Sequence, residues 1–162
     1  PYAFDAVSAL DLLGGLRDAL ASELLQHPDP YVRRWVVRTA GDDRAVALPV
    51  ASALVELGAR ERQPEVRTQL LATARRLPAI TALPIVRAML GNEADVSDQR
   101  MPLMLWWTLE SKAESDRGAL LAFFSEPAVW RLPLARTHGA HHLAQRWPWP
   151  AAATTSKPPR SC

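Results

Sequence analysis

A stretch near the middle of the chain occurs twice, and this internal repeat constrains the fold more than any other feature of the sequence. The first copy opens at residues 29–33 (Asp-Pro-Tyr-Val-Arg), and the second opens about 34 residues later at residues 63–67 (Gln-Pro-Glu-Val-Arg). A second pair of segments, residues 47–50 (Ala-Leu-Pro-Val) and 82–85 (Ala-Leu-Pro-Ile), follows at nearly the same offset. Repeats of this length, with two helical segments and no strand pattern, are typical of α-solenoids.

The residues that open each copy are suited to starting a helix. Asp29 is placed to accept hydrogen bonds from the free N–H groups of the helix that follows, and Pro30 suits the first helical position. Val32 and its counterpart Val66 are both apolar, which indicates that they face the core. Gly41 follows the first of these helices, at a place where a left-handed glycine commonly ends a helix. We therefore expect Gly41 to adopt the left-handed conformation.

Apolar positions at helical spacing extend the same architecture on both sides of the repeat. They predict an all-α domain over residues 1–146, with about four antiparallel helix pairs and no sheet. The expected helices cover residues 5–13, 16–26, 30–40, 47–58, 64–76, 82–90, about 98–109, about 115–124 with Ser115 as cap, and about 127–146, where Pro133 weakens the helix. The predicted core includes Val32, Val36, Leu54, Val66, Leu70, Leu83, Leu105 and Leu121.

The C-terminal segment differs from the rest in composition and charge. Residues 147–162 are rich in Pro, Ala and Thr and offer almost nothing to bury, so we predict a disordered tail. All 17 acidic residues lie at or before Glu126, whereas the charged residues from Pro127 onward are all basic. Such a basic segment could bind nucleic acid, acidic lipid or an acidic partner, but the interpretation we favour is a solvated terminus.

The motif Asp-Pro-x-Val-Arg at this spacing resembles the HEAT-repeat family. The longer string at residues 27–38, followed by Gly-Asp-Asp at 41–43 and Leu-Met-Leu-Trp-Trp at 103–107, resembles more specifically the HEAT segment of PVC-type haem-binding proteins. Those are bacterial membrane-bound dehydrogenases that join a β-propeller, a HEAT array and a c-type cytochrome domain. The resemblance covers residues 6–124. It implies a right-handed α-solenoid of about four HEAT-like helix pairs, and it suggests an extracytoplasmic, periplasmic location.

The sequence predicts no cofactor in this segment. The haem motif Cys-x-x-Cys-His is absent, and Cys162 is the only cysteine, which excludes an internal disulfide and a thiolate metal cluster. No apolar run approaches the roughly 18 residues that a membrane-spanning helix requires, so no membrane insertion is expected. Any redox activity of a parent protein would therefore belong to its other domains.

Three residues are the candidate interaction surface. Trp107 lies two positions after the predicted core residue Leu105, so it points about 200° away from the core on an ideal helix. Its alternatives are core packing against a neighbouring helix and a docking contact, for which tryptophan is enriched. Arg34 and Arg38 lie four residues apart on one helical face.

Arg33 and Arg67 occupy matching places in the two copies. We expect them to pair with acids such as Asp29, Asp42 or Asp43 in adjoining units, and the functional alternative is phosphate binding. The chain has one histidine cluster, formed by His138, His141 and His142, in which His138 and His142 would share a helical face as metal ligands often do. The interpretation we favour is incidental surface histidines, so we predict no metal there.

No catalytic motif occurs in the sequence: a nucleophile-elbow serine, a phosphate-binding glycine loop, His-Glu-x-x-His and an internal cysteine are all lacking. We therefore expect a non-catalytic helical-repeat scaffold or protein-interaction module, a segment of a larger bacterial dehydrogenase or cytochrome protein. Its expected partner is a protein or a neighbouring domain of the parent chain rather than nucleic acid. The alternative is a HEAT-like nucleic-acid-binding protein or base-modifying enzyme.

Overall fold

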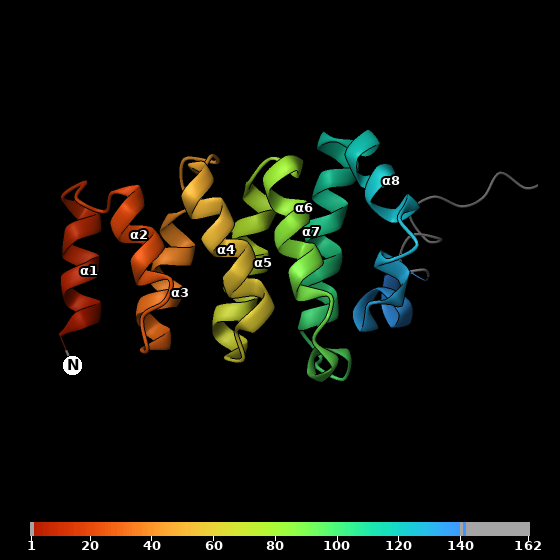
Figure 1. Cartoon of the computed structure of the whole chain (residues 1–162), viewed down its shortest axis with the longest axis horizontal. Helices are drawn as coiled ribbons and strands as arrows, with labels where there is room; N and C mark the ends of the chain where they lie inside the picture. The colour runs from red at the N-terminus through yellow and green to blue at the C-terminus, as the bar shows by residue number, and fades with distance from the viewer. Residues whose placement is uncertain (1, 140, 142–162) are drawn as a thin grey trace, which may run out of the picture.

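The computed structural model describes residues 2–139 and residue 141, and its regular elements are helices (Figure 1). No strand occurs within these residues, so the all-α prediction is confirmed. The predicted tail, residues 147–162, lies outside the described residues. The α-helices are α1 (Ala3–Leu12), α2 (Asp18–Leu24), α3 (Pro30–Thr39), α4 (Leu48–Arg60), α5 (Pro64–Arg76), α6 (Ala79–Met89), α7 (Met101–Ser115) and α8 (Arg117–Ser125), with a 3₁₀ turn at Glu93–Val96.

The helices form two layers. In one layer α1 contacts α3, α3 contacts α5, and α5 contacts α7; in the other, α2, α4, α6 and α8 contact each other in the same order. We call these the odd layer and the even layer. Figure 1 shows the helices following one another along the molecule in chain order. Each helix pair thus covers the pair before it, which makes the core continuous along the molecule.

Prolines mark the starts of several helices. The Asp29 carboxylate accepts the Tyr31 N–H at 2.8 Å, and Pro30 takes the first position of α3, as predicted. Pro49 falls in the first turn of α4. The predicted start of α6 at residue 82 is wrong, because α6 begins at Ala79 and contains Pro84 in its interior. Pro84 has no N–H to donate to the carbonyl four residues earlier, which is that of Ile80. Because Ile80 lies on the exposed side of α6, water can replace this donor.

Gly41 has a packing role instead of the expected left-handed conformation. The left-handed residues in the described chain are Gly14 and Arg44, so the prediction for Gly41 is wrong. A Cβ at position 41 would lie 2.8 Å from the Thr73 methyl carbon and 2.9 Å from a guanidinium nitrogen of Arg76. A side chain at Gly41 would therefore clash with the Thr73 and Arg76 side chains of α5.

This contact leads to a stability prediction. The substitution Gly41→Ala is expected to destabilise the fold by about 1 to 3 kcal/mol, because the Thr73 and Arg76 side chains must move to admit the methyl group. Urea unfolding followed by circular dichroism measures the change. Gly91→Ala is the matched control, since a Cβ there meets nothing within 4 Å and Gly91 has no positive φ. Equal stability of the two variants would contradict the proposed close approach.

The predicted core is correct except at one position. Val32, Val36, Leu54, Val66 and Leu70 are fully buried, and Leu83 and Leu105 are nearly so. Leu121 is 50% exposed, so its prediction as a core residue is wrong.

The register of α8 explains the error at Leu121. Ser115 is the last residue of α7, and Asp116 caps α8 by accepting the Ala119 N–H, so the prediction of Ser115 as cap is also wrong. The buried face of α8 carries Leu120 and Phe123. Leu121 is therefore turned about 100° away from that face.

The predicted helix over residues 127–146 is not continuous. The described part forms a 3₁₀ turn at Val129–Arg131 and a short π-helix at Ala135–Gly139, with Pro133 between them. The Leu134 N–H donates to the Leu90 carbonyl at 3.3 Å, which attaches this segment to the end of α6. Proline lacks the N–H and has the restricted φ that together disfavour one long helix. Residues 142–146 lie outside the described range.

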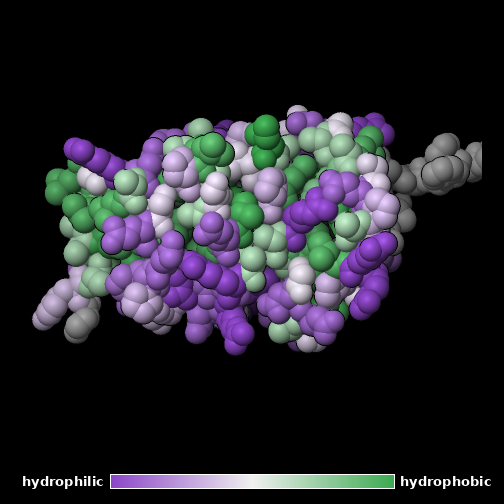
Figure 2. All heavy atoms as spheres, viewed as in Figure 1, coloured by the Kyte–Doolittle hydropathy of each residue, from purple (hydrophilic) through white to green (hydrophobic). Residues whose placement is uncertain are grey.

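The first helix pair leaves apolar side chains in solvent. Tyr2, Leu12 and Leu13 are each at least 80% exposed, and Leu10 is 39% exposed. Figure 2 shows hydrophobic residues gathered at this end of the molecule, where α1 lies. The helix α1 therefore buries only the face that it turns toward α3 and keeps an apolar outer side.

A candidate binding groove on the odd layer

The matched arginines Arg33 and Arg67 have structural partners. Arg33 donates from Nε to Glu61 at 2.7 Å, and Arg67 donates from Nε to Asp95 at 2.9 Å. Both acids come from the segment that follows the even-layer helix of the same pair. The expected partners Asp29, Asp42 and Asp43 are therefore wrong, because each arginine reaches across its own helix pair and not into the adjoining one.

The guanidinium group of Arg67 is buried and surrounded by hydrogen-bond acceptors. It is 2% exposed and donates to the carbonyl groups of Gly58, Glu61 and Met89 as well as to the Asp95 carboxylate. Every hydrogen bond of this set lies within the protein, and the burial leaves no access for a ligand. Arg67 therefore connects the ends of α4 and α6 to α5 and is not a phosphate-binding residue.

The carboxyl group of Glu61 has a shifted pKa. Burial alone would raise the pKa of Glu61, but the hydrogen bond from Arg33, the N–H groups of Gln63 and Arg62, and the charge of Arg33 together lower it below its ordinary value. Glu61 therefore stays ionised at neutral pH. This charge keeps the Arg33 ion pair in place.

Two threonines fix the register of the odd layer. Thr73 on α5 donates to the Val37 carbonyl on α3 at 2.8 Å, and Thr108 on α7 donates to the Leu71 carbonyl on α5 at 3.0 Å. These equivalent bonds match residue 73 with residue 108, and residue 37 with residue 71. The same register continues at Lys112, which donates to the carbonyl of Arg75 at 2.9 Å and to that of Leu77. Burial and the charge of Arg75 lower the pKa of the Lys112 ammonium group.

This register brings the sequence candidates onto one face. Arg38 follows residue 37 and Ala72 follows residue 71, so these two are equivalent on α3 and α5. Ala72 also precedes residue 73 as Trp107 precedes residue 108, so Ala72 and Trp107 are equivalent on α5 and α7. Arg34 lies one turn before Arg38 and is also exposed. The candidate surface predicted from the sequence is thus a single outward face of the odd layer, although Arg38 and Trp107 lie on helices separated by α5.

A groove of about 540 Å³ crosses this face between α3, α5 and α7. Most of its polar lining comes from the C-terminal ends of α3 and α5 and from the loop after α3. We call it the arginine groove. It is lined by Arg38, Asp42, Arg44, Gln69, Ala72, Arg75, Arg76, Met104 and Ser111.

Most of the positive charge of the arginine groove is not neutralised. Arg76 is paired with Asp42 and also donates to the Arg38 carbonyl at 2.6 Å. Arg38, Arg44 and Arg75 have no carboxylate partner among residues 2–139 and 141. Arg38 instead lies over the Trp35 ring, 5.3 Å from its centroid. The groove therefore presents three guanidinium groups that an acidic ligand could pair with.

An apolar strip borders the groove on α7. Trp107 and Leu103 are each 43% exposed and lie four residues apart on α7, with Met104 between them in the groove lining. We call Leu103, Met104 and Trp107 the apolar strip. Trp107 is therefore partly in water and not enclosed in the core.

Sequence reasoning missed Arg44 and Arg75. Arg44 lies in the loop after α3 and Arg75 lies in the last turn of α5, so the two are far apart in the chain and lie on different repeats. One signal is common to the two residues: each lies close to the C-terminal end of its helix, α3 for Arg44 and α5 for Arg75. Cations are favoured at helix C-termini, which also explains this placement without a ligand.

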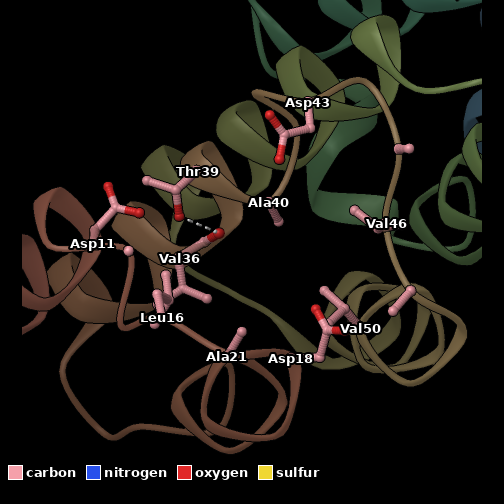
Figure 3. A pocket seen from close by; sticks show the side chains of 13 residues that line it. Asp11, Leu16, Asp18, Ala21, Val36, Thr39, Ala40, Asp43, Val46 and Val50 are labelled. Carbon is pink, nitrogen blue, oxygen red and sulfur yellow. Dashed lines mark hydrogen bonds between the residues drawn. The ribbon is translucent and has the colours of Figure 1, made fainter.

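A second hollow of about 370 Å³ lies between the first two helix pairs. Asp11, Asp18 and Asp43 contribute carboxylates to it, and Leu16 and Val36 contribute apolar surface (Figure 3). Figure 3 shows these carboxylates on different sides of the hollow. In the described chain no group of three or more His, Cys, Asp or Glu side chains is arranged to hold a metal ion.

Two of the three histidines of the C-terminal cluster, His138 and His141, lie in the described range. The Nε2 atom of His138 is 3.1 Å from the Val96 carbonyl oxygen, a contact that joins the C-terminal segment to the turn before α7. His141 is described as well, whereas His142 lies outside the described residues. The contact of His138 is therefore structural.

No family model, curated protein or solved structure matches this chain. The resemblance to the HEAT segment of haem-binding proteins thus rests on the sequence motif alone. Among the helices of the described residues, none is both long and apolar enough to cross a membrane.

Proposed function

We propose that this chain is a non-catalytic binding module, a right-handed HEAT-like α-solenoid of about four helix pairs that docks a protein partner on its odd layer. The repeat period and the order of helix contacts support the solenoid. In such an array each repeat adds surface to one extended face, which suits binding of an elongated partner. By the same resemblance, the chain is a segment of a larger extracytoplasmic protein, and redox chemistry belongs to other domains of that parent.

One observation carries the proposal: the unpaired guanidinium groups and the exposed apolar strip share a single face. Exposed arginines and a half-exposed tryptophan are features of protein-binding surfaces, where Trp and Arg are among the enriched residues. Trp107 is not needed to fill the core, since Leu105 and Leu109 carry the buried stripe of α7. The face is therefore available for a partner without repacking of the fold.

A peptide-display selection against the immobilised chain tests the module. The variant Trp107→Ala is expected to keep its melting temperature nearly unchanged but to lose about 2 kcal/mol or more of binding to the selected peptides. Ile80→Ala removes a comparable exposed apolar side chain from the even-layer helix α6 and serves as the control. A large drop in the melting temperature of Trp107→Ala, or a selection that enriches no peptide, would retire the proposal.

The second candidate function is nucleic-acid binding, and the unpaired arginines of the groove favour it. Binding to duplex DNA at two salt concentrations separates the candidates, because phosphate contacts weaken steeply as salt rises. We expect at most weak and strongly salt-dependent binding. Tight binding that persists at physiological salt would replace the protein-docking proposal with the nucleic-acid one.

A further inference from the structure

We propose that the partner segment is an extended peptide with an acidic cluster followed or preceded by a large apolar residue. Its carboxylates occupy the arginine groove and its apolar side chain lies on the apolar strip of α7. This inference rests on the proposed function and names the chemistry of the partner.

Charge complementarity is the first argument for an acidic occupant. Arg38, Arg44 and Arg75 line one hollow and have no carboxylate partner in the described chain. Carboxylates pair with guanidinium groups through two parallel hydrogen bonds, which gives both energy and orientation. Asp42 is already paired with Arg76, so it leaves the other three arginines to a ligand.

The apolar strip favours a peptide over nucleic acid. Leu103 and Met104 are aliphatic, and together with Trp107 they form a continuous apolar surface beside the charged groove. A nucleic-acid backbone places negative charge along its whole length and would set phosphates against these side chains. A peptide, in contrast, can alternate between acidic and apolar residues. The mixed face therefore fits a peptide whose chemistry changes along its length.

The helix spacing sets the spacing of the two groups in the peptide. Neighbouring packed helices lie roughly 8–10 Å apart, and the arginines span α3 and α5 while the strip lies on α7. An extended chain advances roughly 3.3 Å per residue. The acidic cluster and the apolar residue are thus separated by roughly three to five residues. Ala72, on α5 between Arg38 and Trp107, has a small side chain that lets the peptide lie close to the helix.

The test is a fluorescence anisotropy titration with a synthetic labelled peptide that carries paired glutamates and, about four residues later, a leucine. The double variant Arg38→Gln with Arg75→Gln is expected to bind it roughly tenfold more weakly than the unchanged chain. Arg62→Gln removes an exposed arginine from the connection before α5, at the end of that helix far from Arg75, and should bind like the unchanged chain. Circular dichroism confirms that each variant keeps its fold.

Reversing the charge on both the groove and the peptide tests whether the pairing is electrostatic. Arg75→Glu is expected to bind a peptide with lysines in place of the glutamates more tightly than the unchanged chain does. Glutamine in place of the glutamates should abolish most of the binding, and alanine in place of the leucine should weaken it with little change in salt dependence.

Several outcomes would overturn the inference. The inference fails if the glutamate peptide shows no measurable binding, or if the glutamine peptide binds equally well. It also fails if the double arginine variant binds the glutamate peptide as the unchanged chain does, or if duplex DNA displaces that peptide at physiological salt. The display selection distinguishes this failure from failure of the proposed function. Enriched peptides without acidic residues would leave the docking module intact and refute only the partner chemistry, whereas no enriched peptide would refute both.

Discussion

Replacing Arg67 with alanine is expected to lower the free energy of unfolding by about 3 to 5 kcal/mol. The substitution leaves the Asp95 side chain, which is 9% exposed, as a buried charge without its ion-pair partner. It also removes the donor for the carbonyls of Gly58, Glu61 and Met89. Denaturant unfolding measures the loss, and an intact fold in Arg67→Ala with unchanged stability would contradict the assigned role.

The preceding repeat provides a control for this prediction. Arg33 makes the equivalent ion pair with Glu61, but its side chain is 14% exposed. When Arg33 is removed, Glu61 still accepts the N–H groups of Arg62 and Gln63 at 2.9 Å each. When Arg67 is removed, Asp95 keeps the weaker hydrogen bond from the Asn92 amide at 3.3 Å. Arg33→Ala is therefore expected to cost less than Arg67→Ala. The double variant Arg67→Met with Asp95→Leu should regain part of the stability, because it leaves no unpaired buried charge although the three carbonyl groups still lack their donor.

The parts of the fold that depend on local pattern were predictable from the sequence. The duplicated helix start gives the capping role of Asp29 and the position of Pro30, because these depend on residues within one turn. The apolar stripe likewise identifies Val66 and Leu105 as core residues. In α8 every residue from 119 to 124 is apolar, so the pattern does not select the buried face and the same reasoning places Leu121 on the wrong side.

The parts that depend on contacts between distant segments were not predictable. The partner of Arg67 is Asp95, which becomes a neighbour only because α6 returns the chain to the start of α5. The role of Gly41 depends on Thr73 in the next helix pair, and no local signal reports that contact. The arginine groove likewise forms from side chains on α3, α5 and α7. Sequence reasoning therefore identifies Arg38 and Trp107 separately, and only the stacking of the helices joins them.

The substitution Val66→Asp is expected to leave the domain largely unfolded. Val66 is fully buried on α5, and α5 packs against α3 on one side and α7 on the other. An aspartate there has no solvent, so it either carries an unpaired charge or takes up a proton, at a cost of several kcal/mol. Because a domain of this kind is stable by only about 5 to 15 kcal/mol in total, this cost is a large share of the whole.

Leu121→Asp is the matched comparison, and it separates the structure from the sequence pattern. Both positions read as core in the sequence, but Leu121 is 50% exposed on α8. An aspartate at position 121 keeps its contact with water, so we expect a loss of about 1 kcal/mol or less. Thermal unfolding of the two variants side by side measures the difference. If Leu121→Asp proves as damaging as Val66→Asp, the register of α8 is one residue away from the one described, and Leu121 faces the core after all.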